Sequence, residues 1–186
     1  MRVIGGKYKG KKIDLPVDKN TRPLKDLVKE SIFNIFKHSK KFHVDIAQST
    51  IIDIFSGTGS FGIECFSRGA RKVIFFENYS RAIKILKNNL SRICSEDDFE
   101  IIDTNCFEYF KNYKIINSKN NLIFLDPPFQ EKNINNLIYN IKKQKILDEN
   151  GLIVIHRHKN DKIDLAENLN ILDTRYYGLS KIIFAN

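Results

Sequence analysis

Short runs rich in apolar residues alternate along the chain with longer segments whose apolar residues recur every three or four positions. The longer spacing places Ile83, Leu86, Leu90 and Ile93 on one face of a helix. Each short run has the length and composition of a buried strand. The runs that we interpret as the first five strands are residues 51–54, 72–76, 100–102, 121–125 and 151–155.

Strands and helices alternate five times, which predicts a doubly wound α/β fold with a mainly parallel sheet and helices on both faces. With the strand order 3-2-1-4-5, ligands are expected at the carboxyl ends of strands one and four, where the order reverses. An antiparallel pair around Gly178 closes the chain. The remaining expected elements are helices at 61–68, 106–111 and around 134–141, a helix capped by Ser80, and closing strands at 169–175 and 180–184.

The segment before the first of these strands has a different pattern. Residues 2–15 are expected to form one or two short strands. Residues 21–23, Thr-Arg-Pro, are expected to open a helix, because proline is favoured in a first turn. Apolar residues then follow helical spacing at Leu24, Val28, Ile32, Ile35 and Phe36.

Positive charge is concentrated in this same segment. The chain has 31 Lys and Arg against 22 Asp and Glu, a net charge of +9, and residues 1–41 hold twelve of the basic and four of the acidic residues. A basic extension, 1–41, joined to a nearly neutral domain, 42–186, favours a nucleic-acid partner over a merely solvated lysine-rich surface. On an extended strand Lys7, Lys9 and Lys11 would share one face at a spacing of about 6.6–6.8 Å, which suits a phosphate backbone. The candidate RNA-binding residues are Lys7, Lys9, Lys11, Lys12 and Arg22.

Several other classes of protein are excluded by composition. No apolar run approaches the twenty or so residues of a membrane span, and the first residues lack the apolar region of a signal peptide. Cys65, Cys94 and Cys106 form no Cys-x-x-Cys pair and are odd in number, which argues against a disulfide framework or a zinc cluster. We expect a cytoplasmic protein with no membrane partner.

A glycine-rich loop follows the first predicted strand. Gly57, Gly59 and Gly62 match the pattern Gly-x-Gly-x-x-Gly, and Glu77 ends the next strand twenty residues after Gly57. A carboxylate there can accept hydrogen bonds from both ribose hydroxyls of an adenosine. The pattern alone leaves open a nicotinamide dinucleotide, S-adenosylmethionine, or a plain tight turn with a surface glutamate.

The tetrapeptide Asp126, Pro127, Pro128 and Phe129 ends the fourth predicted strand. The lone pair of an exocyclic base amine is delocalised into the ring, and accepting both amine hydrogens helps to localise and aim it. The Asp126 carboxylate and the Pro127 carbonyl can be the two acceptors, the prolines keep the backbone rigid, and Phe129 can stack on the base. Because strands one and four are neighbours, we expect this corner to face the glycine loop across one cleft.

These residues together resemble the RsmD-type 16S ribosomal RNA guanine-N2 methyltransferases over nearly the whole chain. The resemblance rests on residues 2–6 and 10–12, the Arg-Pro helix, the glycine loop, residues 67–70, Glu77 and residues 126–129. It implies a Rossmann-like class I methyltransferase fold, with a seven-stranded sheet of order 3-2-1-4-5-7-6. It also implies S-adenosylmethionine as the methyl donor and a guanine in small-subunit ribosomal RNA as the substrate. We expect no metal, and a monomer acting on 16S ribosomal RNA, the small subunit or an assembly intermediate.

The resemblance also assigns site residues. Asn105, followed by Cys106, matches the position that contacts the adenine ring, where many relatives have Asp. Residues 156–158, His-Arg-His, depart from the family, which usually has acidic residues there, so no family role is transferred to them and a two-histidine metal site has too few ligands. The expected catalytic residues are Asp126, Pro127, Pro128 and Phe129, and the expected cofactor-binding residues are Asp53, Phe55, Ser56, Gly57, Thr58, Gly59, Glu77, Asn78, Asn105, Cys106 and Asp126.

The mechanism that follows is in-line methyl transfer to guanine N2, with the released proton passing to Asp126 or water. The base must be unstacked to reach the cleft, which costs least in single-stranded RNA. Three alternatives stay open: an amino-methyltransferase acting on adenine or cytosine in DNA or another RNA, a nicotinamide-dependent dehydrogenase, and a non-catalytic RNA-binding module.

Overall fold

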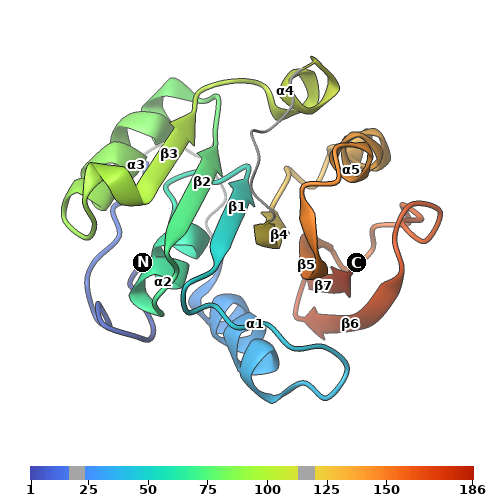
Figure 1. The fold of residues 1–186 in the computed structure, drawn as a ribbon, viewed down its shortest axis with the longest axis horizontal. Coiled ribbons are helices and arrows are strands. Elements are labelled where there is room, and N and C mark those ends of the chain that lie inside the picture. The colour runs from blue at the N-terminus through green and yellow to red at the C-terminus, as the bar shows by residue number, and fades with distance from the viewer. Residues whose placement is uncertain (17–23, 113–119) are drawn as a thin grey trace.

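The computed structural model describes residues 1–16, 24–112 and 120–186, and Figure 1 shows one sheet with helices on both sides. The seven strands follow the order β3-β2-β1-β4-β5-β7-β6, which confirms the expected class I methyltransferase topology. The five strands from β3 to β5 in this order are parallel, and β7 pairs antiparallel with both β5 and β6. The strands are β1 (Thr50–Ile54), β2 (Lys72–Phe76), β3 (Phe99–Ile102), β4 (Asn120–Leu125), β5 (Leu147–His158), β6 (Ile171–Tyr177) and β7 (Ser180–Ala185).

The helices agree with the apolar spacing within a few residues. We expected Ser80 to be the N-cap of its helix, but Ser80 is the first helical residue. The N-cap is Tyr79, whose side chain makes no capping hydrogen bond. The Glu77 carboxylate accepts hydrogen bonds from the N–H groups of Asn78 and Tyr79 at 2.9 Å. It thus provides an acceptor for backbone donors just before the helix begins. Residues 21–23, the expected start of the first helix, lie outside the described residues. The helices are α1 (Asp26–His38), α2 (Ser60–Ser67), α3 (Ser80–Ser91), the short 3-10 helix Glu96–Asp98, α4 (Cys106–Asn112) and α5 (Ile134–Lys143).

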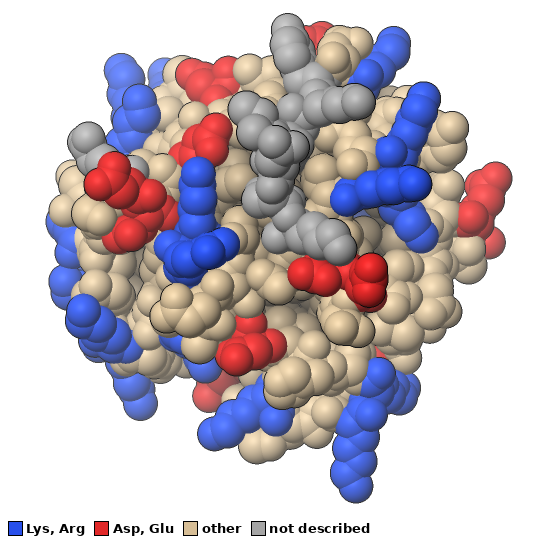
Figure 2. Space-filling view, in the orientation of Figure 1, with Lys and Arg blue, Asp and Glu red and all other residues tan. Residues whose placement is uncertain are grey.

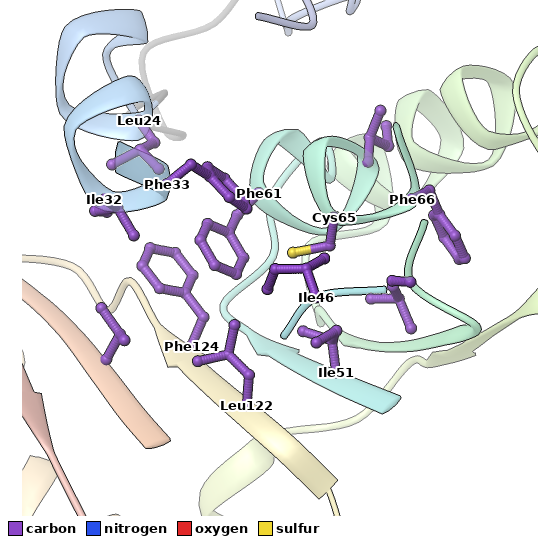
Figure 3. Close-up of a cluster of buried hydrophobic side chains, with 14 of the residues drawn as sticks. Leu24, Ile32, Phe33, Ile46, Ile51, Phe61, Cys65, Phe66, Leu122 and Phe124 are labelled. Atoms are coloured by element: carbon purple, nitrogen blue, oxygen red, sulfur yellow. The ribbon is translucent and has the colours of Figure 1, made fainter. Parts of the chain in front are cut away.

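Each face of the sheet has its own apolar cluster. Helices α1, α2 and α3 cover one face, and α4 and α5 cover the other. On the first face Phe61 stacks on Phe124 with ring centroids 3.8 Å apart, and Phe33 stacks on Phe61 at 5.3 Å (Figure 3). This stack joins α1, α2 and β4, and so ties the helix of the basic extension to the centre of the sheet.

The first thirteen residues form a turn-rich hairpin, so the expected lysine-bearing strand was wrong. The only bridge among them joins Arg2 and Lys12, and residues 5–10 are bends and turns. Gly6 and Gly10 have φ values of +74° and +87°, which a regular strand does not allow. Lys7, Lys9 and Lys11 therefore do not share the face of one strand.

This hairpin is docked on α2 through buried polar groups. The two carboxylate oxygens of Glu64 accept the N–H groups of Ile4 and Gly5, each at 2.8 Å, and the Ser67 hydroxyl accepts that of Tyr8 at 2.9 Å. The ammonium of Lys29, from α1, lies 3.6 Å from Glu64 and donates to the Arg2 carbonyl. Burial lowers the pKa of Lys29, and the nearby charge of Glu64 opposes that shift.

No helix within residues 1–16, 24–112 and 120–186 has the length and apolar character needed to cross a membrane.

Candidate active site at the carboxyl ends of β1, β2 and β4

A cavity of about 810 Å³ lies where β1, β2 and β4 end. Strands β1 and β4 are paired in register up to Ile54 and Leu125, and the N–H of Asp126 donates to the Ile54 carbonyl at 3.2 Å. The glycine loop after β1 and the Asp126 corner after β4 are therefore two walls of the same cavity. The predicted site residues that line it are Asp53, Phe55, Ser56, Gly57, Thr58, Glu77, Asn78, Asn105, Cys106, Asp126, Pro127, Pro128 and Phe129.

The glycine loop turns sharply between β1 and α2. Phe55, Gly57 and Gly59 have φ values of +62°, +56° and +83°. A Cβ on Gly59 would lie 2.4 Å from a methyl group of Leu86, which leaves glycine the residue that fits there. Gly59 is not among the lining residues and instead supports the loop from the side of α3.

Asp53 is buried at the base of the loop. Its Oδ2 accepts the N–H of Gly62 at 3.0 Å, which fixes the start of α2 against β1. Burial raises the pKa of Asp53 to about 8, the Gly62 hydrogen bond opposes that shift, and the charges of Asp126 and Glu77 add to it. Three carboxyl groups thus border the same cavity.

Glu77 ties the loop to the next strand. Its Oε2 accepts the N–H of Gly57 at 2.7 Å, and its Oε1 accepts those of Asn78 and Tyr79. A carboxylate has about four acceptor positions. In this conformation Glu77 therefore keeps about one for a ligand, fewer than the two ribose contacts expected from the sequence.

Asn105 caps the amino end of α4. Its Oδ1 accepts the N–H of Phe107 at 2.9 Å, and its carbonyl accepts that of Tyr109. The side-chain carbonyl that was expected to meet an adenine amine is thus also a helix cap. Cys106 is buried beside it, and burial raises the pKa of its thiol to about 12.

The Asp126 corner is supported from β5 by a residue with no role in the sequence analysis. The Nδ1 of His156 lies 2.8 Å from Asp126 Oδ1, and its Nε2 lies 2.8 Å from the Ser180 hydroxyl. His156 is only 1% exposed. The Phe129 ring meets His156 and His158 edge to face, with centroids 5.5 and 5.1 Å away.

Arg157 holds the backbone that follows the prolines. It is 2% exposed, forms an ion pair with Asp161, and donates to the carbonyls of Pro128, Phe129 and Glu131 at 2.8–3.2 Å. Burying a guanidinium is favourable only where such acceptors are present. Arg157 therefore anchors the backbone of Phe129 to the buried part of the protein.

The sequence patterns could not reveal these two supporting residues. Residues 156–158 stood out for their composition, but their contacts with the Asp126 corner depend on the β4–β5 pairing, in which Leu125 faces Ile155. That register belongs to the folded sheet and cannot be read from residues 156–158 alone.

The predicted RNA-binding lysines, Lys7, Lys9, Lys11 and Lys12, are all exposed, whereas Arg22 lies outside the described residues. The ammonium groups of Lys7 and Lys11 lie 5.4 and 5.0 Å from the Tyr8 ring centre. On the face seen in Figure 2, basic side chains stand around the rim with acidic ones among them. The overall positive charge is thus not gathered into one patch on that face.

Comparison with known proteins places this geometry in a family. The whole chain, residues 1–186, matches the family described as "Conserved hypothetical protein 95". A Haemophilus influenzae protein named "Ribosomal RNA small subunit methyltransferase D" is 31% identical over 181 residues, covering 96% of this chain and 90% of that protein. The chain belongs to the RsmD-type family.

Two further proteins are similar over nearly their full length. The "Putative rRNA methyltransferase YlbH" of Bacillus subtilis is 31% identical over 185 residues, covering 98% of this chain and 96% of that protein. The solved structure of the "Putative methyltransferase yhhF" from Escherichia coli superposes with a TM-score of 0.81 at 24% identity, covering 100% and 96% of the two chains. The fold of this chain is thus the fold of that structure.

Proposed function

We propose that this chain transfers a methyl group from S-adenosylmethionine to the exocyclic N2 amine of a guanine in small-subunit ribosomal RNA. The observation that carries the proposal is that the Asp126 corner and the glycine loop line one cavity. A donor held on the loop and an amine held at the corner would then meet without any movement of the strands. The names of the relatives, which refer to ribosomal RNA, favour the RNA substrate.

The chemistry of the cavity fits S-adenosylmethionine. Its volume of about 810 Å³ lies within the usual range for ligand pockets, about 300–1,000 Å³. The carboxylates of Glu77 and Asp126 suit a ligand that carries a sulfonium and an ammonium group. The rings of Phe55 and Phe107, with centroids 6.0 Å apart, offer an apolar wall for adenine.

When bound, S-adenosylmethionine supplies a methyl group that is already activated by the positive sulfur. The protein has to orient the amine, and Asp126 and the Pro127 carbonyl are the two acceptors that we assign to it. His156 and Arg157 keep the carboxylate and the following backbone in place. After transfer, the proton released by the amine passes to Asp126 or to water.

The nucleic-acid side of the proposal uses the basic extension, residues 1–41. Exposed lysines there can contact phosphates without reading the sequence, while Phe129 stacks on the extruded base. We also propose a cytoplasmic monomer that acts on 16S ribosomal RNA or on a small-subunit particle.

The test is methyl transfer from labelled S-adenosylmethionine to 16S ribosomal RNA, followed by mass spectrometry of the nucleosides. We expect N2-methylguanosine with the native protein. Asp126→Ala should abolish turnover and leave donor affinity within a few-fold, whereas Asp97→Ala, at an exposed aspartate, should change neither. Labelled adenosine or cytidine would show that the base assignment is wrong. RNA binding without any incorporation would indicate a non-catalytic module.

A further inference from the structure

A second hollow, of about 510 Å³, lies between the carboxyl-terminal half of α1 and the edge strand β6. We call it the α1–β6 hollow. It shares no lining residue with the cavity at the ends of β1 and β4. The residues on which the argument rests are Asn34, Ser39, Lys40, Lys41, Arg175 and Tyr177.

Two cations of the hollow are held together by one acidic side chain. Asp173 accepts from the Lys41 ammonium through Oδ1 and from the Arg175 Nε through Oδ2, both at 2.8 Å. Partial burial pushes the pKa of Asp173 up, but its bonds to Lys41 and Arg175 bring it below its ordinary value. Asp173 is therefore a charged partner that fixes the directions of both cations.

The charge of the hollow stays positive after this pairing. Asp173 offsets one of the three positive charges of Lys40, Lys41 and Arg175, and Lys40 makes no ion pair with any described residue. The side chains of Lys41 and Arg175 are 56% and 53% exposed, while that of Asp173 is only 10% exposed. The cations thus face solvent and their anionic partner lies beneath them.

The end of α1 is consistent with an anion above it. The last carbonyls of a helix carry partial negative charge, which disfavours a bound anion. Here Lys37 and His38 occupy the last turn, and the Ser39 N–H donates to the Ile35 carbonyl. Lys40 and Lys41 follow directly after the helix, so the positive charge here exceeds the partial negative charge of the helix end.

We propose that the α1–β6 hollow binds the phosphate backbone of the RNA substrate, as a contact separate from the basic hairpin at residues 1–13. This inference rests on the proposed function for the identity of the polyanion. Arg175 uses Nε for Asp173, and its two terminal nitrogens remain the groups that match a phosphate. Asn34 and Ser39 add neutral donors, and the half-buried Tyr177 offers a ring on which a base can stack.

The features favour a nucleic acid over an acidic protein. The cations come from two segments, Lys40 and Lys41 after α1 and Arg175 on β6, and all three are exposed. Phosphates repeat along RNA at short intervals and meet several cations at once. An acidic protein segment is the other occupant, and the experiment separates the two.

The test measures binding to protein-free 16S ribosomal RNA over a series of salt concentrations. The variant Lys40→Gln/Lys41→Gln/Arg175→Gln removes three positive charges and changes the charge of the hollow from +2 to −1. The two net charges available to phosphates are lost, so the slope of log affinity against log salt should fall by about 1.4. Affinity should fall about tenfold at moderate salt. The control is Lys142→Gln/Lys143→Gln/Lys145→Gln, which neutralises three exposed lysines at the end of α5 and should leave the slope closer to that of the native protein.

Lys40→Gln alone removes one cation without disturbing Asp173, and it should lower the slope by about 0.7. This single variant provides the test if the triple variant does not fold. Lys40→Arg should restore the native slope. An unchanged slope in both Lys40→Gln and the triple variant would overturn the inference. It would also be overturned if binding fell for intact small subunits but not for protein-free RNA, because that result identifies a protein partner.

Methyl transfer measured in the same samples keeps this inference apart from the proposed function. Normal methyl transfer with an unchanged slope would overturn only the inference that the α1–β6 hollow binds RNA. If the native protein transfers no methyl group but the variants reduce the slope, RNA binding at the α1–β6 hollow is supported and the proposed methyl transfer is rejected.

Discussion

The imidazole Nδ1 of His156 lies 2.8 Å from the carboxylate Oδ1 of Asp126. An ionised carboxylate can only accept, so Nδ1 must carry the proton of this bond. In the neutral ring Nε2 is then the acceptor, and the Ser180 hydroxyl, 2.8 Å away, is its donor. The orientation of Asp126 is thus set from β5 and β7 as well as from its own turn.

We expect His156→Leu to lower kcat for methyl transfer by about 10- to 100-fold, the range of one hydrogen bond to a charged group. Donor affinity should stay within a few-fold, because His156 does not line the cavity. His156→Asn keeps an N–H donor near the position of Nδ1 and should recover part of the rate. A kcat for His156→Leu equal to that of the native protein would show that the bond to Asp126 does not matter for turnover.

Arg157→Met should lower both stability and RNA affinity. It leaves Asp161 without its buried partner and frees the carbonyls at 128, 129 and 131, so the free energy of unfolding should fall by about 3–5 kcal/mol. KM for RNA should rise because Phe129 loses its backbone anchor. Denaturant unfolding and steady-state kinetics check the two effects. Arg175→Met, at an arginine that is 53% exposed, should cost less than about 0.5 kcal/mol of stability.

Gly6→Ala should detach the amino-terminal hairpin. A Cβ at Gly6 would lie 1.8 Å from the Ser67 carbonyl oxygen, whereas one at Gly10 would meet nothing within 4 Å. Both glycines have positive φ, so Gly10→Ala carries the backbone strain alone, about 1 kcal/mol. Gly6→Ala should cost at least about 2 kcal/mol more, and trypsin should cleave after Lys7 and Lys9 sooner. Equal stability of the two variants would show that the hairpin does not depend on this contact.

The buried Asp53 predicts that stability declines with rising pH. Its pKa is about 8 in the folded protein and near 4 in the unfolded chain, so the folded state binds the extra proton between these values. Its contribution is complete below about pH 4 and is lost as pH rises through 8, by at most about 1.4 kcal/mol per pH unit. Asp53→Asn carries no such proton. The difference in unfolding free energy between native protein and variant should therefore shrink toward alkaline pH, and a constant difference would contradict the prediction.

The parallel part of the sheet could be predicted because its inner strands β1, β2 and β4 are buried along almost their whole length, whereas the position of β7 and β6 came from the family resemblance. Strand β2 (Lys72–Phe76) is apolar almost throughout, and the helical face of α3 follows it directly. Such patterns are local, and alternation of strand and helix leaves few topologies. The amino-terminal hairpin was misread for the opposite reason. Its alternation of lysine with other residues imitates a strand, while its real shape depends on Glu64 and Ser67, some sixty residues away.

The cavity was predictable to the extent that motifs sit at strand ends. Gly57, Glu77 and Asp126 each follow a parallel strand, and such ends meet at one edge of the sheet. The supports were not predictable. His156 lies beside Asp126 because Leu125 pairs with Ile155 in the parallel β4–β5 ladder and β5 continues past the expected strand end at residue 155.

The docking of the first residues on α2 has a consequence for biosynthesis. Glu64, Ser67 and Asn89, which bind the backbone of residues 4–14, are translated some 60 to 75 residues after their partners. The lysine-rich beginning of the nascent chain must wait, solvated, until α2 and α3 have emerged and formed. If a ribosome stalls before residue 60, α2 is missing and these lysines are not docked on it. They are then free to contact the RNA of the same ribosome.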